Sequence, residues 1–143
     1  MYALNEDPEV IQYTGDSAFE SLEAAQQFLQ NYDAYAQSGM GRWAVVTKNN
    51  AEFIGWCGLK QHQEYVDIGF RFFRKEWGKG YATESAKACL EYAFTELGLS
   101  EVVGRAATAN VASVRVLEKL GMTYWKAAPC DGIMDAVYYR ISS

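Results

Sequence analysis

Two glycines one residue apart, Gly78 and Gly80, lie in a segment whose residue types suit anion binding. Glycine has no Cβ and adopts positive φ readily, so the backbone N–H groups of such a turn can point into one small volume. A helix that begins directly afterwards adds unpaired N–H groups and the positive end of its dipole. Lys75 and Lys79 flank the glycines, and Thr83 offers a hydroxyl donor. The segment predicts a phosphate site, although an isolated G-x-G pattern more often marks only a tight turn.

A strand and a long helix must position this glycine turn. Residues 65–73 (YVDIGFRFF) are rich in β-branched and aromatic residues and predict an extended strand. After the glycines, small and apolar residues recur at helical spacing, namely Ala82, Ala86, Cys89, Ala93 and Leu97. They predict a helix from about Tyr81 to Leu97, which Gly98 ends.

The remaining patterns predict an α+β protein with helices on a mostly antiparallel sheet. Upstream, we expect a short helix and turn near the start and an amphipathic helix capped by Ser21. Three apolar runs separated by turn residues predict an antiparallel meander over residues 42–48, 53–60 and 65–73. Downstream, we expect a strand over 100–108, a helix over 111–121 and a strand over 135–141.

Composition narrows the classes of function. With 143 residues, 50% of them hydrophobic, residues 1–143 are predicted to form one domain with a real core. The net charge of −5 argues against a nucleic-acid partner, because binding to phosphate backbones relies on a basic face. No apolar run is long enough to span a bilayer, no leader opens the chain, and the three cysteines lack metal-ligand spacing. These features predict a cytoplasmic protein with free thiols, no membrane contact and no metal.

Residues 67–122, from "DIGFRFFRKEWGKGYATESAKACLEYAF" through "ANVASVRVLEKLGM", resemble the core of a GNAT-superfamily N-acetyltransferase. The resemblance is to the Rim-type branch, which includes ribosomal-protein alanine acetyltransferases, and it extends over nearly all of the chain. It implies a mixed, mostly antiparallel sheet flanked by helices on both faces, with acetyl-CoA as co-substrate. The glycine turn would then hold the pyrophosphate of acetyl-CoA.

The resemblance also implies the residues that hold the cofactor. Its strand beside the pantetheine arm corresponds to Phe70, Arg71 and Phe72, and its phosphate loop corresponds to Gly78, Lys79, Gly80, Tyr81, Ala82 and Thr83. Asn110 corresponds to the family asparagine that hydrogen-bonds pantetheine, and Lys119 lies where it would approach the nucleotide end.

The catalytic candidates follow from the chemistry of amine acetylation, which needs an acceptor that loses a proton and a thiolate that gains one. Ser113 takes the place of a Rim-type serine near the thioester sulfur and is the candidate acid; its alternative role is to cap a backbone donor. Asp67 takes the place of a strand carboxylate that faces the acceptor cleft, and it is the candidate base, acting through water. Glu64 competes for that role, and an exposed strand aspartate is the alternative for Asp67.

Three features depart from the resemblance. Lys75 stands where the superfamily usually has Gln or Arg, and Met122 replaces the commoner phenylalanine. The extra strand that usually precedes the first helix is missing from the sequence, which starts at Met1. Either the sequence is a truncated or differently started relative, or a partner, such as the second copy in a homodimer, supplies that edge.

The sequence thus predicts an N-acetyltransferase for a primary amine, with a protein or peptide N-terminal α-amine favoured. The alternatives are an acetyltransferase for a polyamine or amino sugar and a non-catalytic acyl-CoA-binding module. The first forty residues hold no Lys or Arg, so a negative rim is expected to attract a cationic acceptor; its acidic residues are Glu6, Asp7, Glu9, Asp16, Glu20, Glu23 and Asp33. His62 is expected to be a solvated loop residue, and Cys57 a small buried one rather than a nucleophile.

Overall fold

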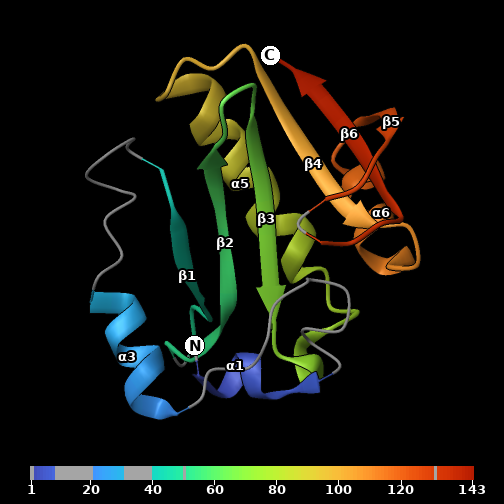
Figure 1. The fold of residues 1–143 in the computed structure, drawn as a ribbon. Coiled ribbons are helices and arrows are strands. Elements are labelled where there is room, and N and C mark those ends of the chain that lie inside the picture. The colour runs from blue at the N-terminus through green and yellow to red at the C-terminus, as the bar shows by residue number, and fades with distance from the viewer. Residues whose placement is uncertain (1, 9–20, 31–39, 50, 131) are drawn as a thin grey trace.

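The computed structural model describes residues 2–8, 21–30, 40–49, 51–130 and 132–143 (Figure 1). Within these residues, one mixed sheet has the strand order β1-β2-β3-β4-β6-β5. The strands are β1 (Arg42–Val46), β2 (Phe53–Gln61), β3 (Val66–Phe72), β4 (Glu101–Ala107), β5 (Thr123–Ala127) and β6 (Ala136–Ser142). The helices are α1 (Tyr2–Glu6), α3 (Leu22–Gln30), α5 (Tyr81–Thr95) and α6 (Val111–Lys119), with a short 3₁₀ helix η1 (Arg74–Glu76) before α5.

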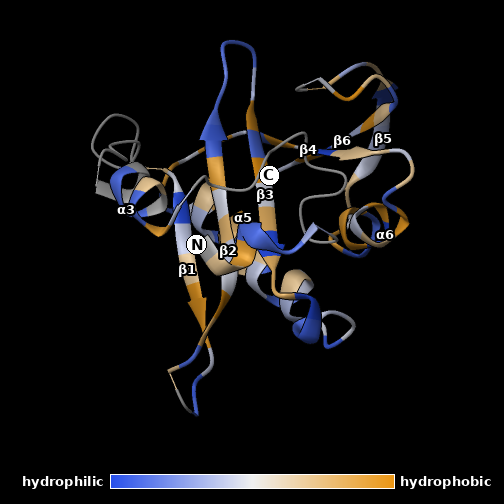
Figure 2. Cartoon of the chain, turned by 60° about the horizontal axis from the view of Figure 1, so that its bottom comes forward, coloured by the Kyte–Doolittle hydropathy of each residue, from blue (hydrophilic) through white to orange (hydrophobic). Residues whose placement is uncertain are grey.

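The predicted meander forms as expected, because β2 pairs antiparallel with both β1 and β3. Figure 2 shows β2 and β3 largely hydrophobic along their middles and hydrophilic at the turn that joins them. The two strands alternate in the side chains that they direct to each face, so Cys57 and Ile68 reach one face while Trp56 and Arg71 reach the other. The α+β class and the mostly antiparallel sheet are confirmed.

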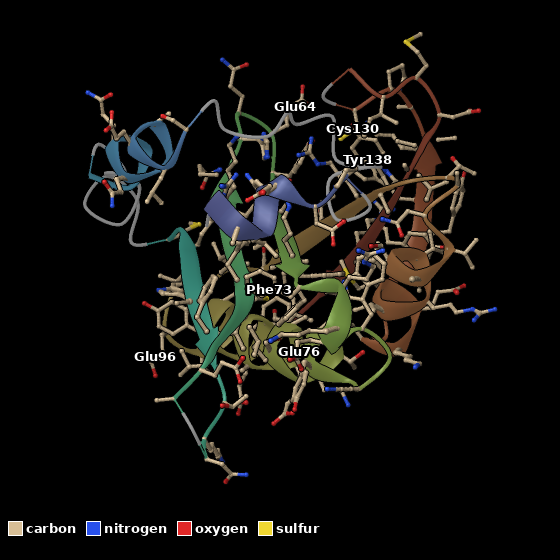
Figure 3. The ribbon with its side chains drawn as sticks, turned by 90° about the horizontal axis from the view of Figure 1, so that it is seen from below. Glu64, Phe73, Glu76, Glu96, Cys130 and Tyr138 are labelled. Atoms are coloured by element: carbon tan, nitrogen blue, oxygen red, sulfur yellow. The ribbon has the colours of Figure 1, made fainter. Side chains whose placement is uncertain are left out.

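Helix α5 covers the first of these faces. Its Ala86, Leu90 and Ala93 are buried in the same cluster as Cys57 and Ile68. Helix α6 packs against β4 and α5, and its Leu117, which is 1% exposed, belongs to the same core. Full burial of one such leucine contributes roughly 1.5–3 kcal/mol to folding. Figure 3 shows α1 and α3 on the other side of β2 and β3.

Strands β3 and β4 run parallel but separate early. They pair only at Asp67↔Val103 and Ile68↔Gly104, although β3 continues to Phe72 and β4 to Ala107. We call the segments beyond the last pair, Gly69–Phe72 and Arg105–Ala107, the β3–β4 fork. On its β4 side, Asn110 begins helix α6 shortly after the strand ends. The fork therefore leaves strand backbone facing an opening between the two halves of the sheet.

The structure departs from the predicted elements in one strand and in where the helices end; helix α6, for example, ends at Lys119 rather than 121. The edge strand β5 was not predicted. It is only five residues long, and its side chains do not alternate between buried and exposed positions as those of a half-buried strand do. Helix α5 ends at Thr95 rather than Leu97, before Gly98 at φ +66°. Among the described residues, no strand precedes Arg42. No helix in this part of the chain has the length and apolarity that a membrane span requires.

Candidate active site

The glycine turn joins β3 to α5, and both of its glycines lie in the left-handed region of the backbone. Gly78 and Gly80 have φ values of +76° and +84°, and Gly80 is the N-cap of α5. Trp77 fixes the start of the turn, since its Nε1 donates a hydrogen bond of 3.0 Å to the carbonyl oxygen of Phe72. A Cβ added at either glycine would meet no atom within 4 Å, so both glycines border open space. The first turn of α5 therefore directs its unpaired N–H groups toward an open volume.

A second helix begins on the other side of the fork. Asn110 is the N-cap of α6, and its Oδ1 accepts a hydrogen bond of 3.3 Å from the backbone N of Ser113. Asn110 therefore caps the N-terminus of α6. Capping a backbone donor was the alternative role given for Ser113. No hydrogen bond of the Ser113 hydroxyl is found within the described ranges. Two helix N-termini, at Gly80 and Asn110, consequently border one opening.

That opening is a pocket of about 570 Å³ between α5, α6 and the fork. Ten of the eleven residues expected along the cofactor line it: Phe70, Arg71, Phe72, Gly78, Gly80, Tyr81, Ala82, Thr83, Asn110 and Lys119. Lys79 does not line it; its Nζ lies 3.2 Å from Glu76 Oε2, and its side chain is 53% exposed. Ser113 lines the pocket with the cofactor residues.

The pocket also has lining residues that were not among the predicted site residues. Arg115 and Val116 follow Ser113 on α6, and Glu76 is a buried carboxylate, 9% exposed, at the end of η1. The charged lining residues are Arg71, Arg115 and Lys119 against Glu76, which gives the pocket a positive balance. The helical spacing of Asn110, Ser113 and Val116 was the available signal for this wall of the pocket. Nothing in the sequence indicated the inward position of Glu76.

Asp67 lies outside the lining of this pocket. Its Oδ2 is 2.7 Å from Arg105 Nη2 and 3.1 Å from His62 Nε2, and the residue is 8% exposed. Asp67 is therefore neither an exposed strand aspartate nor a carboxylate with an uncompensated charge. Its competitor Glu64 is exposed in the turn between β2 and β3. The expectation for His62 was wrong: its side chain is 22% exposed, because it packs onto Asp67 and Tyr65 instead of projecting into solvent.

The remaining reactive groups have structural surroundings. Cys57 and Cys89 are free buried thiols whose sulfur atoms lie 3.4 Å apart between β2 and α5. The contact with Cys89, aided by burial, raises the pKa of the Cys57 thiol, so Cys57 stays neutral near pH 7 and is a poor nucleophile. Burial raises the pKa of Tyr138 to about 12, and its hydroxyl donates to the carbonyl oxygen of Pro129. In the described ranges, no three potential metal ligands gather closely enough to hold an ion.

Comparison with known proteins identifies the family. The chain matches the acetyltransferase (GNAT) domain over residues 1–123. It is 34% identical to the uncharacterized protein YkkB of Bacillus subtilis over 142 residues, which cover 95% of this chain and 81% of that protein. It is 36% identical over 134 residues to FsC-acetyl coenzyme A-N(2)-transacetylase of Aspergillus fumigatus, covering 85% of this chain and 56% of the fungal protein.

A solved structure shows the same fold. The GNAT-family acetyltransferase of Bacillus anthracis superimposes with a TM-score of 0.82 at 28% identity, covering 99% of this chain and 86% of that one. The chain therefore belongs to the GNAT family of acetyltransferases. It is an acetyl-CoA-dependent acyltransferase, in agreement with the pocket between two helix N-termini.

Proposed function

We propose that the protein transfers the acetyl group of acetyl-CoA to a primary amine by direct attack in a ternary complex. The favoured acceptor is a protein or peptide N-terminal α-amine, as in the Rim-type branch. The observation that carries the proposal is the pocket in which the glycine turn, the β3–β4 fork and the start of α6 meet. The relative named as an acetyl coenzyme A-N(2)-transacetylase supports a nitrogen acceptor.

In this proposal the pocket binds acetyl-CoA along its length. The backbone N–H groups from Gly78 to Thr83 hold the pyrophosphate, because two glycines at positive φ and the start of α5 present donors there. The pantetheine arm lies along Phe70–Phe72, where β3 has no strand partner on the fork side. Asn110 uses its Oδ1 to cap α6, which leaves its Nδ2 group to donate to the arm. Lys119 supplies positive charge at the same pocket.

Ser113 is the proposed proton donor to the departing thiolate. It lines the pocket one helical turn after Asn110, and within the described ranges its hydroxyl has no competing hydrogen bond. Most of the rate gain comes from holding the amine and the thioester together. The amine gives up its proton to water as the N–C bond forms, and Ser113 protonates the departing thiolate and regains its own proton from water. The role of Asp67 is treated below.

The acceptor side is built partly by α1. Asn5 Oδ1 accepts a buried hydrogen bond of 2.7 Å from Arg71 Nη1, and Asp7 Oδ2 lies 3.1 Å from Arg74 Nε. These two contacts hold the first helix against the residues that border the pocket. Asp7 is consequently charge-compensated, and the negative rim proposed for the acceptor depends on the other acidic residues. Of those, Glu6 and Glu23 are described, and the structure does not describe Glu9, Asp16, Glu20 and Asp33.

A thiol-release assay over a panel of acceptors tests the function. The panel holds peptides with free and blocked N-termini, polyamines, amino sugars and simple amines of each charge. We expect cationic acceptors to give the highest kcat/KM and this value to fall as salt increases, because screening weakens attraction between charges. A peptide whose N-terminus is blocked and that lacks lysine is the matched control and should release no thiol.

Other results of the panel would change the proposal. Neutral or acidic acceptors that react best, without salt dependence, would show that the acidic segment is only a solubilising surface. Highest activity on polyamines or amino sugars would replace the N-terminal acceptor. Tight acetyl-CoA binding by calorimetry without thiol release on any acceptor would favour the non-catalytic acyl-CoA-binding module.

A further inference from the structure

We infer that Asp67 and Arg105 form a brace that sets the opening of the β3–β4 fork, so Asp67 is a positioning residue rather than the base. The inference rests on the proposed binding of acetyl-CoA in the fork. Asp67 occupies one of the two positions at which β3 pairs with β4. Arg105 is the first residue of β4 beyond the last pair. The ion pair between them therefore ties the two strands at the point where they separate.

Two residues of the turn between β2 and β3, His62 and Tyr65, also contact the brace. Asp67 Oδ2 accepts from Arg105 at 2.7 Å, and His62 Nε2 lies 3.1 Å from the same oxygen. Arg105 Nη1 also donates a hydrogen bond of 3.3 Å to the Tyr65 hydroxyl, and its guanidinium lies 5.9 Å from the centre of the Tyr65 ring. The side chains of Asp67 and Arg105 are only 11% and 12% exposed, so water screens their attraction weakly. Each of these two side chains thus contacts the other and one residue of this turn.

The same contacts make Asp67 a poor base. A base must reach the amine or a water that contacts it, yet Asp67 does not line the pocket that holds Ser113 and Asn110. To accept a proton, its carboxylate would give up a charge-assisted hydrogen bond and leave Arg105 a poorly hydrated cation without that counter-ion. The geometry instead suits a group that stays ionised throughout the reaction.

We expect the fork to depend on the brace, because no strand pairing joins β3 and β4 within the fork. Strands β3 and β4 have no register pair beyond Ile68↔Gly104, and the backbone of Gly69–Phe72 would face the pantetheine arm. Without the ion pair, β3 and β4 would sample wider separations. The pantetheine arm of acetyl-CoA would then bind only those molecules in which the two strands are close together. The apparent Kd for acetyl-CoA would rise in inverse proportion to the fraction of molecules in which the fork is narrow enough to bind.

The test compares Asp67→Asn, Arg105→Gln and the double variant. We expect the Kd for acetyl-CoA, by calorimetry, to rise about tenfold in each single variant, and the double variant to be no worse than either, since all three break one interaction. The pH profile of kcat should keep its wild-type shape in Asp67→Asn. Glu52→Gln, which breaks the exposed ion pair with Lys75, is the matched carboxylate-to-amide control and should leave Kd unchanged.

A second measurement needs no cofactor. Hydrogen exchange on the ligand-free protein should be faster at the amides of Gly69–Phe72 and Arg105–Ala107 in Asp67→Asn than in wild type. If wild-type protein binds no acetyl-CoA, the proposed function fails while this measurement still tests the brace. If Asp67→Asn folds too poorly, Arg105→Lys serves instead, because it keeps the positive charge but loses the planar guanidinium group. It should give a smaller increase in the same hydrogen-exchange rates.

Two results would overturn the inference. The first is an Asp67→Asn protein with wild-type Kd and exchange rates but with turnover nearly abolished and the acidic limb of the pH profile lost, as expected for a base. The second is an Arg105→Gln protein that is indistinguishable from wild type in both Kd and hydrogen exchange.

Discussion

Gly80→Val should bind acetyl-CoA about 30-fold more weakly than wild type, which corresponds to about 2 kcal/mol. Gly80 has φ +84°, a conformation that a β-branched residue avoids. Valine would shift the free turn toward negative φ, so binding would have to restore the strained geometry. Its side chain would also project into the open space that the phosphates are proposed to fill. Calorimetry with acetyl-CoA measures the loss.

Gly98→Val is the matched control for this substitution. Gly98 follows the other end of the same helix, has φ +66° and likewise borders open space, but it does not line the pocket. We expect Gly98→Val to lower the melting temperature to a similar extent without changing the Kd. A folded Gly80→Val protein with wild-type affinity would rule out the glycine turn as the phosphate site.

Ser113→Ala should lower kcat about 100-fold, in the range that one positioned proton donor contributes. The Kd for acetyl-CoA should stay nearly constant, because a donor to the leaving group acts in the transition state. The helix should also persist, since Asn110 rather than Ser113 caps α6. Steady-state kinetics and calorimetry on the same preparation separate the two quantities.

Ser113→Cys provides the comparison, because it keeps a proton donor of similar size at the same position. We expect it to recover part of the activity that Ser113→Ala loses. An alanine variant with wild-type kcat would remove Ser113 from the reaction. A variant that loses affinity and turnover together would make Ser113 a binding residue instead.

The sequence predicted most of the pocket lining, partly from local patterns and partly from the resemblance to GNAT acetyltransferases. The glycines, the start of α5 and the run from Asn110 to Lys119 each lie within a few residues of one another, and helical spacing is legible in a single chain. The meander was predicted for the same reason, since its strands are consecutive and its turns short. The short edge strand β5 has no such pattern and was missed.

The surroundings of Asp67 were beyond sequence reasoning for a physical reason. Arg105 reaches Asp67 only because β4 lies parallel to β3, and that pairing closes a loop containing the whole of α5. No local periodicity reports such a contact. His62 was misjudged similarly: its polar neighbours indicated solvent, whereas the fold brings Tyr65 and Asp67 against its ring.

The early separation of β3 from β4 also bears on how the chain folds. The sheet consists of two parts, β1–β2–β3 and β4–β6–β5, and each is formed by a continuous stretch of chain. On average, strand pairing within each part closes a shorter loop than the pairing of β3 with β4. Contacts between residues that are close in sequence form faster. We therefore expect each part to assemble as its own nucleus, with the docking of β4 beside β3 across α5 as the late step. A chain arrested before that step would expose two unsatisfied strand edges at once, which makes this intermediate the species most prone to aggregate.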